Sequence, residues 1–227
     1  MPAPLSIVIP ALNAEADLPG CLNALVPALE ANLLREVIVA DGGSIDATPR
    51  LAEGSGATLI SSEQGRATQM IAGAKAARGE WLLFLHADTW LSRDWVERTL
   101  AHIEKHPEKA AAYTLAFRTD HPMGKVIARR ANWRARTFGL PFGDQGLLIS
   151  RKLYEDIGGY EDLPLMEDFK LARALGKSRI SILSAQARTG AKKYEKDGWR
   201  RRSVQNIWLQ ARYLCGADPE KLARAYH

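Results

Sequence analysis

The chain has 227 residues, 46% of them hydrophobic, a formal net charge of +5 at pH 7, and two cysteines. This length is long for one domain and short for two, so we expect a single domain with a C-terminal extension. The absence of any apolar stretch of roughly 18–20 residues, of a basic and apolar leader, and of metal-ligand spacing between Cys21 and Cys215 favours a cytoplasmic protein with ordinary thiols.

The first half of the sequence alternates short apolar runs with helix-like segments. Strands are predicted at residues 5–9, 36–40, 57–61 and 81–85, with helices at 18–29, from Thr48 onward, and at 67–77. Thr48 followed by Pro49 is typical of a helix start, with the hydroxyl as cap and proline at the first helical position. Continuous apolar strands separated by helices indicate a parallel sheet covered on both faces, so the fold class is predicted to be α/β.

The second half of the sequence is less regular. Strands are predicted at residues 111–117 and 146–149, and helices at 125–138, 166–175 and 199–214. In the last of these, apolar residues recur at helical spacing; they are Val204, Ile207, Trp208, Ala211 and Leu214.

Positive charge is concentrated between residues 188 and 202, where seven Lys and Arg stand against Glu195 and Asp197. Such a run fits a solvated face, a phosphate-rich ligand or an anionic membrane surface. Nucleic acid is the least favoured partner, because no zinc-finger spacing or aromatic RNA-binding signature accompanies the charge.

Three of the predicted strands are followed by polar residues suited to ligand binding. PALNAE follows the first strand at residues 10–15, DGGSID the second at 41–46, and HADT the fourth at 86–89. Ligands of open parallel sheets bind beyond the carboxyl ends of the strands, so these three segments should meet at one site. No G-x-G-x-x-G follows the first strand and no P-loop is present, which disfavours dinucleotide-binding dehydrogenases and P-loop enzymes.

The ordered set SIVIPALNAE (6–15), VADGGS (39–44) and FLHAD (84–88) resembles the family 2 glycosyltransferases. The resemblance covers nearly the whole chain and implies a GT-A fold, with a mainly parallel sheet, a Rossmann-like first half and a C-terminal helical extension. Residues 1–110 would form the nucleotide-sugar half, 111–190 the acceptor half and 191–227 a basic helical tail. Residues 83–89 and 143–146 are most similar to a small single-domain bacterial branch associated with arsenosugar biosynthesis.

The resemblance also implies a donor site. By match, Asp41 would hydrogen-bond the nucleobase, and Arg66 would face the nucleotide or its phosphates, a task that suits a guanidinium. The other expected donor-site residues are Pro10, Asn13, Glu15, Gly43, His86, Ala87 and Asp88. For several of these a plain structural role is the alternative; Asp41, for example, could instead cap the turn at Gly43.

Asp88 matches the last position of the family's Asp-x-Asp pattern and is therefore the expected ligand of Mg²⁺ or Mn²⁺. A hard cation there would neutralise the charge that develops on the departing diphosphate. His86 stands in place of the first aspartate. An imidazole at this position could help hold the ribose or the metal environment, but it carries less charge than a carboxylate. This departure from the family pattern would either weaken metal affinity or favour a borderline metal such as manganese.

The family's Glu-Asp pair is matched by Glu167 and Asp168. Inversion at the anomeric carbon needs a carboxylate to take the acceptor proton, and by match Asp168 is that base and Glu167 supports it. A paired acid at a helix N-terminus is also a common stabilising device. Asp144 and Gln145 are expected on the acceptor side, and Arg200, Arg201 or Arg202 are expected to clamp the donor diphosphate.

The sequence thus predicts an inverting, metal-assisted transfer of one sugar from a nucleotide-diphosphate sugar, with UDP favoured, to a small-molecule or lipid acceptor. The Gln-x-x-Arg-Trp signature of processive relatives is absent. The alternative hypothesis is a non-catalytic protein that binds nucleotide sugars or a partner and has lost the full metal motif at His86. A peripheral membrane contact through the basic tail is a further expectation.

Overall fold

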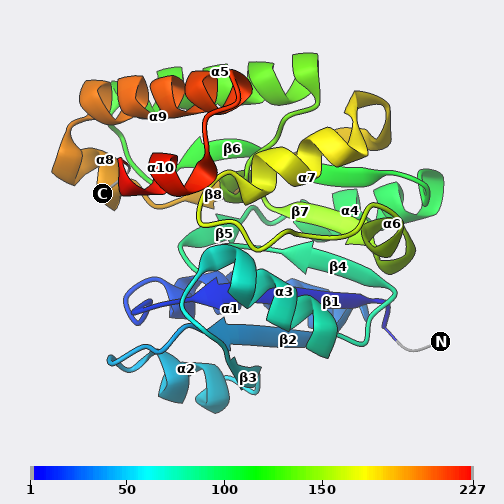
Figure 1. The fold of residues 1–227 in the computed structure, drawn as a ribbon. Helices are drawn as coiled ribbons and strands as arrows, with labels where there is room; N and C mark the ends of the chain where they lie inside the picture. The colour runs from blue at the N-terminus through cyan, green and yellow to red at the C-terminus, as the bar shows by residue number, and fades with distance from the viewer. Residues whose placement is uncertain (1–2, 226–227) are drawn as a thin grey trace.

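The computed structural model describes residues 3–225 as one eight-stranded sheet with helices on both faces (Figure 1). The strands are β1 Leu5–Ala11, β2 Leu34–Asp41, β3 Thr58–Ser61, β4 Trp81–Phe84, β5 Thr89–Leu91, β6 Ala110–Phe117, β7 Leu147–Ser150 and β8 Ile180–Thr189. The α-helices are α1 Leu18–Glu30, α2 Thr48–Gly54, α3 Arg66–Ala76, α4 Trp95–Lys105, α5 Pro122–Phe138, α6 Arg151–Asp156, α7 Glu167–Leu175, α8 Lys192–Asp197, α9 Trp199–Leu214 and α10 Pro219–Arg224. Among these described residues, no helix is both long and apolar enough to cross a membrane.

The strand order is β3-β2-β1-β4-β7-β6-β8-β5. The first four strands in this order pair in parallel, whereas β7 runs antiparallel to both β4 and β6, and β5 antiparallel to β8. Strand order reverses at β1, since β2 lies on one side of it and β4 on the other. The predicted α/β class with a mainly parallel sheet is therefore confirmed, and the reversal at β1 and β4 marks the edge where a ligand site is expected.

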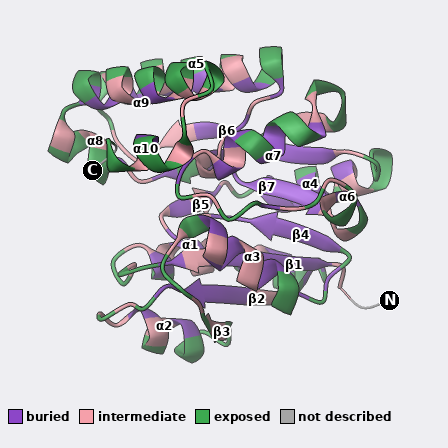
Figure 2. Cartoon of the chain, viewed as in Figure 1, coloured by how far each residue is buried: buried purple, intermediate pink, exposed green. Residues whose placement is uncertain are grey.

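The two faces of the sheet carry separate apolar cores because successive side chains of a strand point in opposite directions. Ile7 and Ile9 of β1 pack with α1 and α4, whereas Val8 of the same strand packs with α3 and α7. Figure 2 shows the result, a buried sheet between helices whose outer sides are exposed. Both cores leave the carboxyl ends of β1 and β4 free to carry polar loops.

The start of α2 differs in detail from the prediction. Thr48 is the first residue of the helix, and Ala47, at the N-cap position, has no capping side chain. The Asp46 carboxylate accepts from the backbone N–H of Thr48 at 2.9 Å. The Thr48 hydroxyl instead accepts a hydrogen bond of 2.7 Å from the backbone N–H of Ala14. The capping prediction was wrong because this hydroxyl joins the loop after β1 to α2.

Candidate functional site

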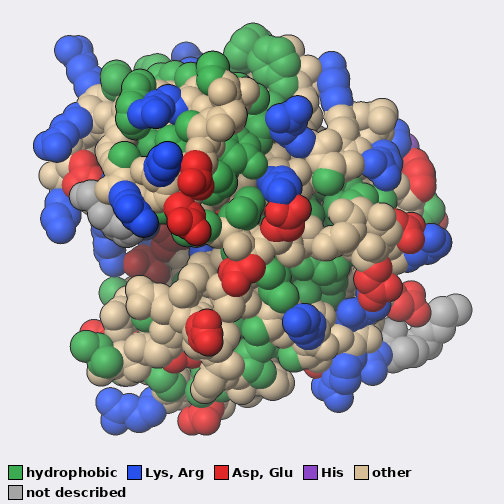
Figure 3. Space-filling view, viewed as in Figure 1, with side chains coloured by type: hydrophobic (Ala, Val, Ile, Leu, Met, Phe, Trp, Pro, Cys, Tyr) green, Lys and Arg blue, Asp and Glu red, His purple; other side chains and the backbone are tan. Residues whose placement is uncertain are grey.

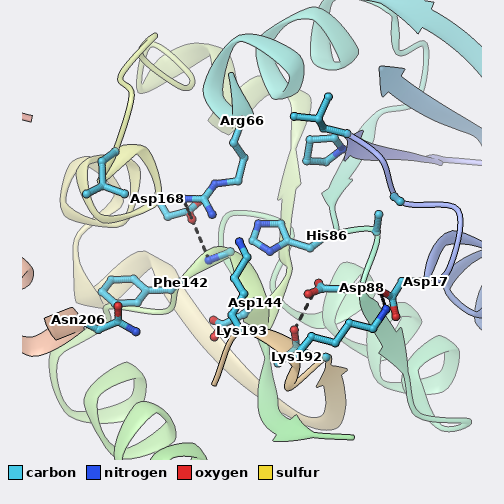
Figure 4. A pocket seen from close by; sticks show the side chains of 18 of the residues that line it. Asp17, Arg66, His86, Asp88, Phe142, Asp144, Asp168, Lys192, Lys193 and Asn206 are labelled. Carbon is cyan, nitrogen blue, oxygen red and sulfur yellow. Dashed lines mark hydrogen bonds and ion pairs between the residues drawn. The ribbon is translucent and has the colours of Figure 1, made fainter. Parts of the chain in front are cut away.

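A cavity of about 660 Å³ opens where β1 and β4 end, beside the C-terminal segment. Its walls come from the loops after these two strands, the start of α3, residues 142–144, α7, and residues 189–194 with α9. Figure 4 shows charged side chains from most of these elements converging on it, with Asn206 from α9 beside them. Of the three segments predicted to meet at one site, 10–15 and 86–89 contribute to the cavity lining, whereas no residue of 41–46 does.

The predicted nucleobase aspartate organises a turn. One Asp41 carboxylate oxygen accepts from the backbone N–H groups of Gly43 and Ser44, at 3.1 and 3.0 Å, and the other accepts from the Ser44 hydroxyl. Gly43 has a φ of 91°, which a side chain disfavours. Neither Asp41 nor Gly43 lines the cavity. Their observed role is to shape the loop beside it.

The loop after β1 is joined to the loop after β2. The Asn13 side-chain oxygen accepts from the N–H of Ile45 at 3.0 Å, and Glu15 accepts from the N–H of Ala47 at 2.9 Å. Pro10 and Asn13 line the cavity, whereas Glu15 does not. These contacts make the two loops one platform next to the cavity.

Asp88 points into the cavity from the loop between β4 and β5. One of its carboxylate oxygens lies 3.4 Å from the hydroxyls of Thr89 and Thr189, which is long for a hydrogen bond. The other oxygen faces Gly190, where an added Cβ would lie 3.4 Å away. Ala87 also lines the cavity. The carboxylate therefore keeps lone pairs available for a ligand.

Asp88 fits a divalent cation that takes most of its ligands from elsewhere. Residues 3–225 contain no cluster of three or more His, Cys, Asp or Glu placed to hold a metal. Mg²⁺ is commonly bound by one or two carboxylates together with substrate phosphates and water. Asp88 supplies one such carboxylate at the cavity, so phosphate and water oxygens would have to complete the coordination of a cation there.

His86 and Asp168 meet at Gly143. A Cβ built on Gly143 would lie 2.5 Å from His86 Nε2 and 2.6 Å from Asp168 Oδ2. Burial lowers the pKa of His86 to about 4, and the positive charge of Arg66 contributes to the shift. Among the described residues, its buried Nε2 has no hydrogen-bond partner. His86 is therefore neutral near pH 7, and its Nε2 faces Gly143 without a hydrogen-bond partner among the described residues.

Asp168 is held from two sides. The backbone N–H of Gly143 donates to Oδ2 at 3.0 Å, and the Tyr160 hydroxyl donates to Oδ1 at 3.2 Å. Burial, followed by the negative charge of Asp168, raises the pKa of Tyr160 well above its usual range, so this hydroxyl stays a donor. The carboxylate is thereby fixed in orientation while it lines the cavity.

Glu167 lies behind Asp168 and pairs with Arg66. The Arg66 Nε donates to one oxygen of the buried Glu167, and its Nη2 lies 4.0 Å from Asp168. Burial, followed by the charge of Asp168, raises the pKa of Glu167, although Arg66 opposes the shift. Arg66 and Asp168 line the cavity and Glu167 does not. Glu167 thus positions Arg66 beside Asp168.

The two residues expected on the acceptor side have different environments. Asp144 lines the cavity. Burial raises the pKa of its carboxyl to about 6, although the positive charge of Arg134 opposes the shift. Gln145 is fully buried, and its amide donates to the backbone oxygen of Tyr113 at 3.0 Å. Gln145 lies outside the cavity lining and supports the turn that carries Asp144.

The C-terminal segment is tied across the cavity to the loop after β1. Asp17 accepts from Lys192 Nζ at 2.7 Å and from Arg118 Nη2 at 2.8 Å. Arg118 also donates to the backbone oxygen of Asp88 at 3.1 Å, and its guanidinium lies 3.7 Å over the Trp90 ring. Residues 175 positions apart are thus joined beside Asp88.

Arg66 lines the cavity as predicted, but the C-terminal cations there differ from those that the sequence suggests. Lys192 and Lys193 line it, and of the expected clamp only Arg202 does. Arg202 is buried and pairs with Asp197 at 3.1 Å. Arg200 and Arg201 are exposed and lie outside the lining.

Sequence reasoning missed Asp17, Arg118, Tyr160 and the cavity role of both lysines. Lys192 and Lys193 could have been found, because the basic run was recognised and they follow the glycine at its start. Asp17 and Tyr160 lie in segments with no local signal, and their roles depend on contacts between distant parts of the chain.

In a comparison with protein families, residues 6–158 match Glycosyl transferase family 2. A curated relative, the "PGL/p-HBAD biosynthesis glycosyltransferase" of Mycobacterium bovis (strain BCG / Pasteur 1173P2), is 35% identical over 162 residues. The aligned region is 67% of this chain and 57% of the relative, so the chain spans little more than half of that protein's length.

Solved structures with the same fold include two with bound donor nucleotides. Glucosyl-3-phosphoglycerate synthase from Mycobacterium tuberculosis, in complex with Mn²⁺ and UDP-glucose, matches with a TM-score of 0.62 at 18% identity, covering 90% of this chain and 77% of that one. S. aureus TarS 1-349 in complex with UDP-GlcNAc matches with a TM-score of 0.61 at 22% identity, covering 82% and 58%. At these identities the likeness establishes the fold alone.

Proposed function

Because this chain belongs to glycosyltransferase family 2, we propose that it transfers a single sugar from a UDP-sugar to an acceptor hydroxyl, with inversion at the anomeric carbon. The observation that carries the proposal is the pair of carboxylates, Asp88 and Asp168, on one cavity at the reversal of strand order. The cavity volume of about 660 Å³ is within the range of small-molecule sites.

In the proposed reaction, Asp168 is the general base. Its carboxylate takes the proton of the acceptor hydroxyl as that oxygen forms a bond to the anomeric carbon. The bond from this carbon to the diphosphate oxygen breaks, and UDP leaves with the electron pair. Gly143 and Tyr160 fix the carboxylate by two hydrogen bonds, which supports its use as a positioned base.

Asp88 is proposed to hold Mg²⁺ or Mn²⁺ together with the donor diphosphate. The metal would supply charge neutralisation at the leaving oxygen. His86, a neutral residue that lines the cavity, would contact the donor or the metal environment. The structural relatives bound to Mn²⁺ or UDP-sugars support this choice of donor and metal.

Positive charge at the cavity supports a diphosphate ligand. Lys192 and Lys193 from the C-terminal segment and Arg66 from α3 line the walls that carry Asp88 and Asp168. We assign the diphosphate to Lys192, Lys193 and Arg66, with Arg202 behind them, and the acceptor to the side of Asp144. Pro10, Asn13, Glu15, Asp41 and Gly43 are proposed to form the nucleoside platform.

Within the family, residues 83–89 and 143–146 support membership of the small single-domain branch associated with arsenosugar biosynthesis. That association assigns no substrate to this chain. The acceptor is proposed to be a small molecule or a lipid that presents a free hydroxyl.

The test is calorimetric titration with UDP in Mn²⁺ and again in EDTA, followed by UDP-release assays with UDP-glucose and UDP-GlcNAc. Wild-type binding should require the metal, and Asp88→Ala should abolish the metal-dependent part. Asp168→Asn should bind UDP normally while its turnover falls by about 10²–10⁴-fold. Preserved turnover in Asp168→Asn would remove this residue from the role of base, and undiminished UDP affinity in EDTA would contradict metal assistance.

A further inference from the structure

Helices α5 and α9 are packed together along the upper edge of the molecule in Figure 1 and present an apolar surface to solvent. The His121 ring at the start of α5 stacks on Trp199 at the start of α9, with ring centroids 4.9 Å apart. We define the α5–α9 face by the exposed apolar side chains of these two helices: Val126, Trp133, Phe138, Val204, Ile207, Trp208 and Leu214.

Helix α5 has the reverse of the usual burial pattern. It buries small residues, namely Gly124, Ala128, Ala131 and Ala135. It turns its large apolar residues outward, with Val126 at 53% and Trp133 at 58% exposure. An amphipathic helix that packs only on its own domain buries its large apolar side chains instead.

Helix α9 also turns large apolar side chains outward, although it buries Trp199 and Leu209. Its bounds agree with the predicted ones, but the apolar stripe that the sequence places on one face points to solvent. Val204 is 65% exposed and Trp208 46% exposed, whereas the inner side of the helix carries Trp199, Arg202 and Leu209. Helical spacing therefore identified a real apolar face, but that face is directed away from the core.

The charge around this apolar surface is of one sign. Helix α5 contains five Lys or Arg residues and α9 contains four, and neither helix contains Asp or Glu. Seven of the nine are exposed: Lys125, Arg129, Arg130, Arg136, Arg200, Arg201 and Arg212. Figure 3 shows hydrophobic, Lys and Arg side chains over the upper part of the molecule, with acidic ones beginning lower down.

We propose that the α5–α9 face docks on an anionic lipid bilayer surface. Helices that lie in a membrane interface combine exposed Trp and aliphatic side chains with many Lys and Arg residues, and α5 and α9 have this composition. A second copy of the chain is disfavoured as the occupant, because two all-cationic faces would repel each other. Nucleic acid would account for the charge, but it would leave the outward aliphatic stripe unexplained.

Helix α9 connects this face to the candidate active site. Arg202, Asn206 and Leu209 on its inner side line the cavity, while Val204 and Trp208 lie on its outer side. One helix diameter, about 10 Å, therefore separates the docked lipid from the cavity wall. The docking surface differs from the contact through the basic tail (191–227) expected from the sequence, because α5 contributes as much of it as α9.

The test is co-sedimentation of the full chain with phosphatidylcholine vesicles, with and without phosphatidylglycerol, at low and high NaCl. The wild type should pellet with the anionic vesicles at low salt and be released by high salt. The double variant Trp133→Glu/Trp208→Glu should lose at least about tenfold in partitioning. Trp133→Ala/Trp208→Ala, which adds no charge, should show a smaller loss in the same direction.

The matched control is Leu29→Glu/Leu100→Glu, which makes the same kind of change at exposed leucines of α1 and α4. This control should bind vesicles like the wild type, and circular dichroism should show all variants folded. Wild type that ignores anionic vesicles, or a tryptophan variant that pellets normally, would overturn the proposal. So would a lipid-free dimer, detected by light scattering, that the tryptophan variant dissociates. UDP binding should be unchanged in every variant, so the donor-site proposal is judged separately.

Discussion

Gly143 is a residue whose lack of a side chain allows two reactive groups to approach each other. A Cβ there would lie 2.5 Å from His86 Nε2 and 2.6 Å from Asp168 Oδ2, closer than such atoms pack. We expect Gly143→Ala to displace both groups and to lower kcat by about 10²-fold, the cost of a shift of about 1 Å in a catalytic group. Steady-state UDP release measures this.

The control for this change is Gly54→Ala at the end of α2, where an added Cβ meets nothing within 4 Å. It should leave turnover unchanged and stabilise the fold by at most about 1 kcal/mol. If Gly143→Ala proved as active as Gly54→Ala, the positions of His86 and Asp168 would not matter for turnover.

Asp144 makes stability depend on pH. Burial raises its pKa from 3.8 to about 6. Below pH 4 the carboxyl is therefore mostly protonated in both the folded and the unfolded chain, and it does not reduce the free energy of unfolding. As pH rises toward 6, the unfolded chain ionises first and the folded state loses stability, until both are ionised. Between pH 4 and 6 the free energy of unfolding of Asp144→Asn should therefore rise relative to that of the wild type, by about 1–3 kcal/mol in total.

Urea denaturation at a series of pH values from 4 to 8 measures this difference. The gain of Asp144→Asn in free energy of unfolding should level off above pH 6. A difference that stays constant over the whole series would mean that the Asp144 carboxyl titrates normally in the folded protein.

At the scale of elements, the tie between α8 and the loop after β1 can be tested directly. Burial raises the pKa of Asp17, but hydrogen bonds from Lys192 and Arg118 outweigh it and hold the value below its ordinary range. Asp17→Ala should cost about 1–3 kcal/mol, because it leaves Arg118 without its carboxylate partner. It should also make trypsin cleavage after Lys192 and Lys193 several-fold faster, since the segment loses its anchor.

The control is Asp156→Ala, which removes an exposed pair with Lys152 within one helix. Such pairs contribute about 0.5 kcal/mol or less, and cleavage after Lys192 should not change. Equal losses of stability in both variants would show that the tie across the cavity is no stronger than a surface ion pair.

Elements were predictable from the sequence where the pattern was local. The buried runs gave β1, β2 and β4, and the topology of parallel strands placed His86 and Asp88 at the ligand edge. The strand β8 was missed because it is not a continuous apolar run like β1 or β4, although the alternation of polar and apolar residues in it is typical of a half-buried strand. For α9 the spacing gave the bounds and the apolar stripe but not its direction, since only tertiary packing decides which side of a helix faces the core.

The whole molecule should respond to its donor as one folding unit. A ligand that binds only the folded state stabilises it by about 2.7 kcal/mol at a concentration of 100 Kd. For a chain of this size, that amount corresponds to a rise in Tm of roughly 5–10 °C. We expect UDP with Mn²⁺ to produce this rise in a thermal denaturation experiment.

Measuring Tm with the metal alone and with the nucleotide alone separates their contributions to this rise. Mn²⁺ alone should move Tm little, because residues 3–225 offer no cluster of three or more His, Cys, Asp or Glu for it and the diphosphate must complete its coordination. UDP in EDTA should give only part of the rise, and Asp88→Ala should remove the metal-dependent remainder. A full rise in EDTA, or one that survives in Asp88→Ala, would place the stabilising contacts on the cationic side chains, with no metal at Asp88.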